Sequence, residues 1–313
     1  MTGRRGPRVV LVTGGSSGIG LATALELARA GDHLVLLARA REPLDRAAAQ
    51  CRSAGAGSVT TVSADVRDAE AVAAAVQQVH ADHGRLDVVV FSAGVAAYGR
   101  FEEVPTEVFD GVVSTLLLGS ANVARAVLPR MRADDHGTLV LVGSVIGTIG
   151  VPQMSPYVIG KWGVRALARQ LQLENRDRPG VRVTLVTPAG VDTPIYRQAA
   201  NYAGRVGQPP PPVYSPGRVA RAIVRALDDP PRRLSIGVAN PVMALGFALL
   251  PRLYDVLVGP LFSLGARGDE RVEPTAGNVL APVPERERMR GEAPTSADRV
   301  RRLLSHLDVA GGG

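Results

Sequence analysis

The sequence predicts an α/β domain in which a doubly wound parallel sheet lies between two layers of helices. Through the first 190 residues, short β-branched and aliphatic runs alternate with longer segments of helical periodicity. Short buried strands that alternate with helices indicate βαβ units and a parallel sheet covered on both faces. Right-handed crossovers between these units give a three-layer α/β/α arrangement.

The elements follow one another as strand and then helix. The first strand, residues 8–13, is a β-branched run that ends at a pair of glycines, and the periodic segment 19–30 follows it. The apolar run 34–38 precedes an alanine-rich helical stretch at 43–54. The pattern repeats in three further pairs of strand and helix: 59–63 with 69–83, 86–92 with 107–131, and 138–143 with 155–176.

The pattern becomes less regular after the sixth strand, which we expect at residues 181–186. Proline, glycine and small polar residues dominate 192–214, which predicts a loop or lid beside the sheet. A helix is expected at 216–227 and a last strand at 233–238.

These features divide the 313 residues into three parts. Residues 1–238 form the α/β domain, and 239–262 form an apolar extension that carries three prolines. Residues 263–313 are charged and poor in large apolar side chains, so we expect a mobile tail with a short helix-like segment at 297–307.

Composition argues against several classes of protein. A single cysteine, Cys51, excludes an internal disulfide and fits a reducing compartment, so we expect a cytoplasmic location. The basic N-terminus precedes too short an apolar run for a signal peptide. The histidines lack metal-ligand spacing, so no metal is predicted. The net charge of +7 is spread along a chain with 4% aromatic residues, which does not favour nucleic-acid binding.

One lysine stands out among 36 basic residues, because Lys161 is the only lysine in the chain. Tyr157 lies four residues earlier on an expected helix, so the two side chains share a face. A phenol with a pKa of about 10 exchanges protons poorly at neutral pH unless its phenolate is stabilised. The Lys161 ammonium can provide that stabilisation. Ser144, at the end of the fifth strand, could bond a substrate carbonyl.

A glycine-rich loop joins the first strand to the first helix. It reads Gly14-x-x-x-Gly18-x-Gly20. Glycines allow the backbone to turn tightly and to approach a pyrophosphate, which rests on the N–H groups of the helix N-terminus. The loop therefore indicates a dinucleotide site.

Together these motifs resemble the classical short-chain dehydrogenases/reductases, a family of Rossmann-type nicotinamide enzymes, over about residues 8–238. The resemblance implies hydride transfer between the nicotinamide and a carbonyl or carbinol carbon. Tyr157 would exchange the proton on the oxygen, Ser144 would position that oxygen, and Lys161 would lower the pKa of Tyr157 and hold the ribose. The resemblance places these residues on the dinucleotide: Gly14, Ser16, Ser17, Gly18, Ile19, Gly20, Asp65 (adenine), Val66, Ala93, Gly94, Tyr157, Lys161, Pro188, Val191 and Thr193.

The end of the second strand bears on the choice of dinucleotide. NAD(H) sites usually carry an acidic residue there, whereas this chain has Arg39 and Arg41. A planar guanidinium suits a 2′-phosphate. We therefore expect NADP(H) rather than NAD(H), with Arg39 as the first choice and Arg41 as the second.

Two positions depart from the family pattern. Ser92 precedes Ala93 and Gly94 where the family has asparagine, and Leu116 takes the place of the family's catalytic asparagine. Leucine cannot bond the water that links Lys161 to a proton relay. Slower catalysis, a relay through Thr115 or Ser114, and loss of activity all stay open. The rival function is a dinucleotide-binding sensor or membrane-associated scaffold without turnover.

The apolar segment 240–262 has three interpretations. It can close an apolar substrate pocket or a subunit interface, attach peripherally to a membrane, or form a short spanning hairpin, against which its prolines argue. The first two fit an apolar carbonyl or secondary alcohol as the substrate. The resemblance also implies a homo-oligomer.

Overall fold

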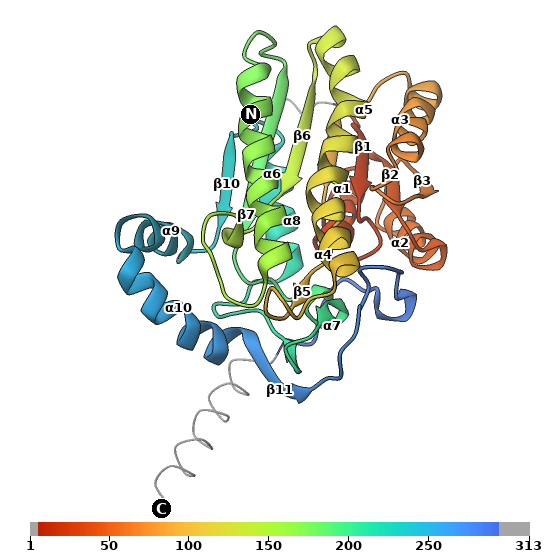
Figure 1. The fold of residues 1–313 in the computed structure, drawn as a ribbon. Helices are drawn as coiled ribbons and strands as arrows, with labels where there is room; N and C mark the ends of the chain where they lie inside the picture. Colours follow the sequence, from red (N-terminus) through yellow and green to blue (C-terminus); the bar gives the residue numbers. More distant parts are fainter. Residues whose placement is uncertain (1–5, 294–313) are drawn as a thin grey trace, which may run out of the picture.

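The computed structural model describes residues 6–293 and has the predicted three-layer α/β/α architecture (Figure 1). Seven parallel strands form the central sheet in the order β10-β7-β6-β4-β1-β2-β3. The winding direction reverses between β1 and β4, so the predicted doubly wound sheet is confirmed. The strands are β1 (Val9–Thr13), β2 (His33–Ala38), β3 (Ser58–Ser63), β4 (Val88–Phe91), β6 (Gly137–Val142), β7 (Val181–Pro188) and β10 (Arg233–Ile236).

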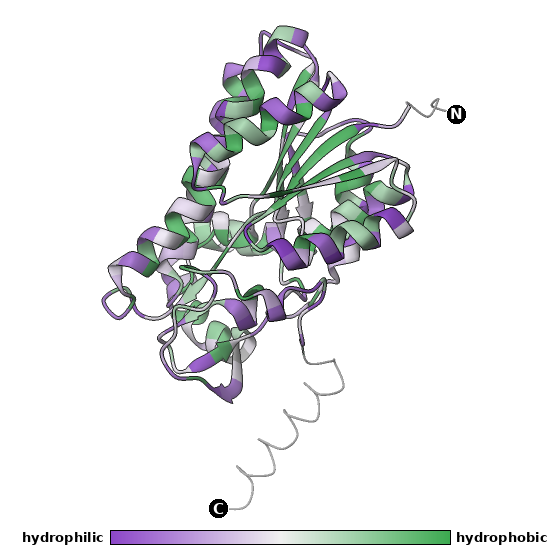
Figure 2. Ribbon diagram, turned by 90° about the vertical axis from the view of Figure 1, so that its right-hand side faces the viewer, coloured by the Kyte–Doolittle hydropathy of each residue, from purple (hydrophilic) through white to green (hydrophobic). Residues whose placement is uncertain are grey.

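Helices cover both faces of the sheet because successive strand residues point to opposite sides and both sides are apolar. In β1, Leu11 belongs to a core under one helical layer and Val12 to a core under the other. Figure 2 shows the strands as a nearly continuous hydrophobic layer. The first layer contains α3 (Ala69–His83), α5 (Gly119–Asp134) and α6 (Ser155–Glu174), and the second contains α1 (Gly18–Arg29), α2 (Arg41–Ser53) and α8 (Pro216–Ala226).

The long helix expected at 107–131 contains a π-helical turn. The chain forms α4 (Thr106–Val113), the π-turn η1 (Ser114–Leu118) and then α5 without a break. This helix of 29 residues is long and apolar enough to cross a membrane by length and composition. Half of its most apolar window is buried inside the domain, which identifies it as a core helix.

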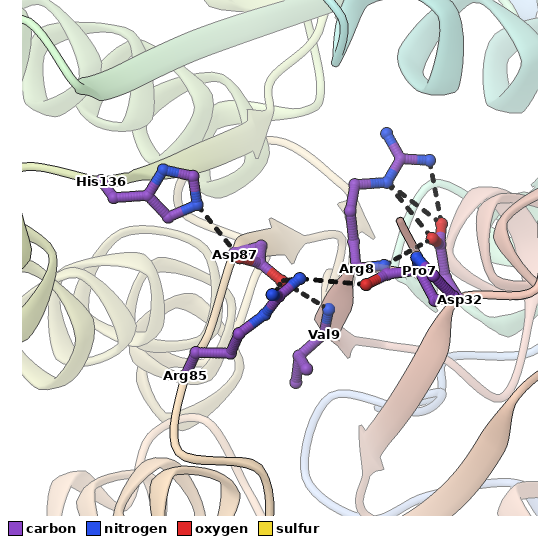
Figure 3. A network of polar contacts seen from close by, with 7 residues as sticks. All are labelled: Pro7, Arg8, Val9, Asp32, Arg85, Asp87 and His136. Atoms are coloured by element: carbon purple, nitrogen blue, oxygen red, sulfur yellow. Dashed lines mark hydrogen bonds and ion pairs between the residues drawn. The ribbon is translucent and has the colours of Figure 1, made fainter. Parts of the chain in front are cut away.

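A polar network ties together the amino ends of four strands (Figure 3). The buried Asp32 carboxylate accepts hydrogen bonds from the backbone and guanidinium of Arg8, at 2.9 to 3.3 Å. Asp87, just before β4, accepts from the Val9 N–H at 2.7 Å and from Arg85 and His136 at 2.9 and 3.0 Å. Among the described residues, the hydrogen-bond partners of Asp32 and Asp87 belong to this edge of the sheet, so the network fixes the starts of the strands.

The segment 192–214, expected as a loop or lid, also contains short regular elements. A helical turn, α7 (Ile195–Gln198), is followed by β8 (Ala200–Asn201) and β9 (Arg205–Gly207). β8 pairs with β5 (Ala97–Tyr98), so this segment is fastened to the chain that follows β4.

The apolar extension forms two helices, α9 (Asn240–Leu249) and α10 (Pro251–Ala266). Pro241 and Pro251 occupy first-turn positions, which have no intrahelical N–H bond to lose. These two prolines therefore begin helices, and Pro260 lies inside α10.

The structure differs from the expected mobile tail over residues 263–293. The chain completes α10, forms β11 (Arg267–Arg271) antiparallel to β9, and returns along the carboxyl edge of the sheet toward α2, through a short turn η3 (Pro284–Arg286) (Figure 1). This segment is held by backbone hydrogen bonds and by the fully buried Val279, neither of which its charged composition reveals. The helix-like segment expected at 297–307 lies outside the described residues.

Candidate active site

A cavity of about 780 Å³ opens at the carboxyl ends of β1, β4, β6 and β7, where the winding direction reverses. In open α/β sheets this is the place where ligands bind. The glycine-rich loop lines one part of the cavity, and α9 and α10 line another. The cavity brings together every predicted catalytic and cofactor-binding residue except Gly20 and Arg41, and it omits the relay candidate Ser114.

The glycine-rich loop packs against the chain after β4 so closely that side chains would not fit. Gly14 has a φ of 65°, and a Cβ there would lie 2.8 Å from the Ala93 nitrogen. A Cβ at Gly20 would strike the carbonyl oxygen of Gly14, so Gly20 packs the helix against the loop and does not line the cavity. Ser16, Ser17, Gly18 and Ile19 line it. This backbone cradle has the geometry to bind a dinucleotide pyrophosphate.

The predicted catalytic side chains meet beside the cavity. Ser144 caps a short turn after β6, where its hydroxyl accepts from the Ile146 N–H at 3.2 Å. Tyr157 lies on the first turn of α6, and the Lys161 ammonium lies 5.7 Å from its ring centroid. Lys161 also donates to the Val142 carbonyl at 2.8 Å, which links α6 to β6.

Burial governs the titration of both α6 residues. It raises the pKa of Tyr157 to about 12, contrary to the lowering expected from Lys161, although a hydrogen bond with Ser144 acts in the opposite direction. It lowers the pKa of Lys161 to about 8. At neutral pH the phenol therefore keeps its proton and can donate it to a carbonyl oxygen, while Lys161 stays a cation that is readily neutralised.

Leu116, in the place of the family's asparagine, fills space beside this group. It is fully buried, and a Cβ added at Gly160 or Gly94 would lie 2.7 or 3.2 Å from its methyl carbons. Its neighbour Thr115 lines the cavity with a buried hydroxyl that has no hydrogen-bond partner among the described residues. Ser114 does not line the cavity. Of the two relay candidates, Thr115 is the one that faces the site.

At the adenosine end, Arg39 lies in the cavity and Arg41 does not. Burial lowers the pKa of Arg39, and Asp65 beside it acts in the opposite direction. Asp65 is itself paired with Arg67 at 2.6 Å. Arg41 begins α2 and forms an exposed ion pair with Asp45 at 3.2 Å.

The other predicted contacts also have definite places. Pro188, Val191 and Thr193 line the cavity at and after the end of β7, and Val66, Ser92, Ala93 and Gly94 line it after β3 and β4. Asn122, the first asparagine after Leu116, does not line the cavity, and its amide donates to the Val66 and Arg67 carbonyls.

The far end of the cavity is predominantly apolar. Met154, Met243, Leu257 and Phe262 are among the side chains that line it, with most of the remainder supplied by α9 and α10. Tyr254 fastens α10 to the catalytic domain by donating to the Gly150 carbonyl at 2.6 Å.

The lining residues that escaped the sequence interpretation include Asn278 and Glu287. The Ser16 hydroxyl donates to the Glu287 carboxylate, and the Arg39 guanidinium donates to the Asn278 carbonyl at 2.6 Å. No motif spacing or periodicity indicates that these two residues belong to the site. Both lie in the segment whose charged composition predicts mobility.

Comparison with known proteins assigns the family. The family model described as short chain dehydrogenase matches residues 8–202. The uncharacterized oxidoreductase YxnA of Bacillus subtilis is 31% identical over 256 residues, 80% of this chain and 71% of that protein. The 3-dehydrosphinganine reductase TSC10B of Arabidopsis thaliana is 37% identical over 194 residues, 61% of this chain and 57% of that protein.

Solved structures agree with this assignment. A short-chain dehydrogenase from Streptomyces avermitilis superposes with a TM-score of 0.68 at 30% identity, covering 79% of this chain and 94% of that one. An alcohol dehydrogenase from Thermococcus sibiricus, complexed with 5-hydroxy-NADP, superposes with a TM-score of 0.63 at 30% identity, covering 73% and 95%. The chain therefore belongs to the short-chain dehydrogenase/reductase family of NAD(P)-dependent oxidoreductases, as its motifs predict.

Proposed function

We propose that this protein is an NADP(H)-preferring oxidoreductase that interconverts an apolar carbonyl compound and its secondary alcohol. The observation that supports this most strongly is the continuity of the cavity. One space contains the glycine-rich loop, the Ser144–Tyr157–Lys161 group and an apolar chamber under α9 and α10. Such a space accommodates a dinucleotide and a lipophilic substrate side by side.

The dinucleotide, when bound, supplies or accepts the hydride at the reacting carbon. In reduction, Tyr157 donates its phenolic proton to the carbonyl oxygen, and Ser144 donates a hydrogen bond that orients this oxygen. The Lys161 ammonium stabilises the phenolate that results. In oxidation the phenolate removes the alcohol proton.

The preference for NADP(H) rests on Arg39. Its guanidinium lies in the cavity just after β2, while no carboxylate occupies the end of that strand. A guanidinium can bind a 2′-phosphate through two parallel hydrogen bonds. Arg41 is an unsuitable partner because it lies outside the cavity.

The experiment is NADPH oxidation with a series of ketones and aldehydes of increasing apolar length. We expect turnover that improves with length until the chamber under α9 and α10 is filled. A Met243→Asp variant would lose the longer substrates and keep the short ones, with Val238→Asp as an exposed control outside the cavity. NADPH binding without turnover in either direction would favour the sensor.

Peripheral membrane contact through residues 240–262 is a second proposal, favoured by the outer face of α9 and α10. Leu245, Leu249 and Val256 are 59%, 67% and 70% exposed and do not line the cavity, and α9 carries no charge. An apolar face continuous with an apolar chamber suits a substrate that partitions into lipid. Leu249→Asp with Val256→Asp would then reduce cosedimentation with phosphatidylglycerol vesicles, and equal sedimentation would contradict it.

The homo-oligomer implied by the family stays a prediction, which light scattering of the purified protein tests.

A further inference from the structure

Residues 276–293, here named the strap, lie across the dinucleotide end of the cavity. One end is attached where the Asn278 N–H and amide donate to the backbone and side-chain oxygens of Gln198 at 2.8 and 2.9 Å. The next residue, Val279, is fully buried in the core under α4. At the other end, Gly291 and Ala293 donate to Asp192 at 3.2 and 3.1 Å. The strap is thus docked at both ends.

Along the strap, oxygen atoms accept hydrogen bonds from groups that would otherwise be available to a dinucleotide. The hydroxyl of Ser16, which is 5% exposed, donates to the Glu287 carboxylate. The Gly18 N–H, at the start of α1, donates to the Arg288 carbonyl at 3.0 Å. The Arg39 guanidinium donates to the Asn278 and Val279 carbonyls at 2.6 and 3.3 Å.

The negative charge of Glu287 opposes the binding of a second anionic group at this position. Burial raises the pKa of the Glu287 carboxyl, while the hydrogen bond from Ser16 and the nearby charges of Arg39 and Arg46 act in the opposite direction. A 2′-phosphate beside Arg39 would bring about two further negative charges to the same place. Two negative charges that lie close together in a partly buried site repel each other strongly. Glu287 and a 2′-phosphate therefore cannot share it at low free energy.

We propose that Glu287 is a specificity-determining residue, whose carboxylate competes with the 2′-phosphate of NADP(H) for the anion position beside Ser16 and Arg39. The strap is a tethered competitor that a 2′-phosphorylated nucleotide displaces. A nucleotide without this phosphate does not require Glu287 to leave, so the strap weakens the preference for NADP(H) that Arg39 alone would give. The inference rests on the proposed function, because it requires a dinucleotide in this cavity.

The test measures nucleotide binding by calorimetry on the full-length chain, with 2′,5′-ADP and 5′-AMP as probes that need no turnover. Glu287→Gln removes the charge and keeps an acceptor for Ser16. We expect this variant to bind 2′,5′-ADP roughly tenfold more tightly and 5′-AMP within about twofold of the wild type. Glu285→Gln, an exposed neighbour in η3, is the matched control and should change neither affinity.

Each outcome has a separate meaning. Unchanged or weaker 2′,5′-ADP binding in Glu287→Gln would overturn the competition, provided that both probes bind the wild type. If neither probe binds any variant, the proposed function itself fails. Amide hydrogen exchange gives a second readout, because 2′,5′-ADP should accelerate exchange in residues 276–293 and 5′-AMP should not. Slower exchange with 2′,5′-ADP would show that the strap closes over the ligand, contrary to the proposal.

Discussion

The two edges of the parallel sheet differ in how fully their buried polar groups are hydrogen-bonded within the chain. At the amino edge, the Asp32 and Asp87 carboxylates are surrounded by donors from Arg8, Val9, Arg85 and His136 (Figure 3). At the carboxyl edge, Lys161 has a single acceptor within residues 6–293, although its ammonium carries three donors.

This difference indicates which edge of the sheet can bind a ligand. A buried charge with all its partners inside the chain stabilises the fold and offers nothing to a substrate. Buried groups with unused hydrogen bonds, gathered around a cavity and with shifted pKa values, are typical of a functional site. Substitutions at the amino edge should therefore change stability, and those at the carboxyl edge should change chemistry.

The largest expected effect is that of Lys161→Met, which should reduce turnover by about 10³-fold because the phenolate of Tyr157 loses its cation. The same change should not destabilise the protein at pH 7. The folded-state pKa of Lys161, about 8, lies below the ordinary lysine pKa of 10.5, so burying the charged form opposes folding by an amount on the order of 3 kcal/mol. Loss of the hydrogen bond from Lys161 to the Val142 carbonyl offsets part of the stability that is gained when the buried charge is removed.

The sign of the pH dependence follows from the same pKa. Between about pH 8 and 10.5 the unfolded chain binds a proton that the folded chain has released, so the stability of the wild type rises there relative to Lys161→Met. Urea unfolding of both proteins at pH 7 and 9.5 measures this difference. A gap that stays constant with pH would contradict the burial of a charged lysine.

Asp87→Asn should have the opposite effect, a loss of stability without a change in nucleotide binding. The amide cannot accept from Val9, Arg85 and His136 together, and its own N–H groups face donors. We expect a loss of about 2–4 kcal/mol in unfolding free energy with unchanged nucleotide affinity. Asp45→Asn, which breaks an exposed pair, is the control and should change stability little. Weakened nucleotide binding in Asp87→Asn would show that the edges are coupled.

Arg39→Gln should reduce the affinity for 2′,5′-ADP by roughly ten- to thirtyfold, since a charge-assisted contact to phosphate is lost. Arg41→Gln should leave it unchanged, because Arg41 lies outside the cavity. Calorimetric titration distinguishes the two. Equal losses in both variants would indicate a general effect of positive charge.

The smallest effect is expected at Thr115. If its unpartnered hydroxyl replaces the family's asparagine in a proton relay, Thr115→Val should lower turnover roughly three- to tenfold and steepen its pH dependence. Thr115→Ser should restore both, and cofactor affinity should stay constant throughout. A Val variant with wild-type rates at every pH would remove Thr115 from the relay.

The core of the fold and the group at α6 could be predicted because their signals are local. Apolar runs predict the strands, helical spacing places Tyr157 and Lys161 on one face, and α3 begins and ends at the predicted residues 69–83. The π-turn at Ser114–Leu118 has no such signal, because it leaves the apolar pattern almost unchanged.

The segment after β10 was harder to predict for physical reasons. Pro241 and Pro251 break a helix in its interior but suit its first turn, and sequence alone does not say where the first turn lies. The strap is held by backbone bonds and by isolated contacts such as Val279 and Glu287, which produce no periodicity. Its composition indicates mobility for that reason.

The most direct test of the contrast between the edges is Tyr157→Phe, assayed beside the wild type for NADPH oxidation, NADPH affinity and unfolding free energy. The variant keeps the ring and removes the proton-carrying oxygen. We predict turnover lower by about 10³-fold, with affinity and stability close to those of the wild type. Turnover that survives in Tyr157→Phe would contradict the assignment of the chemistry to the carboxyl edge.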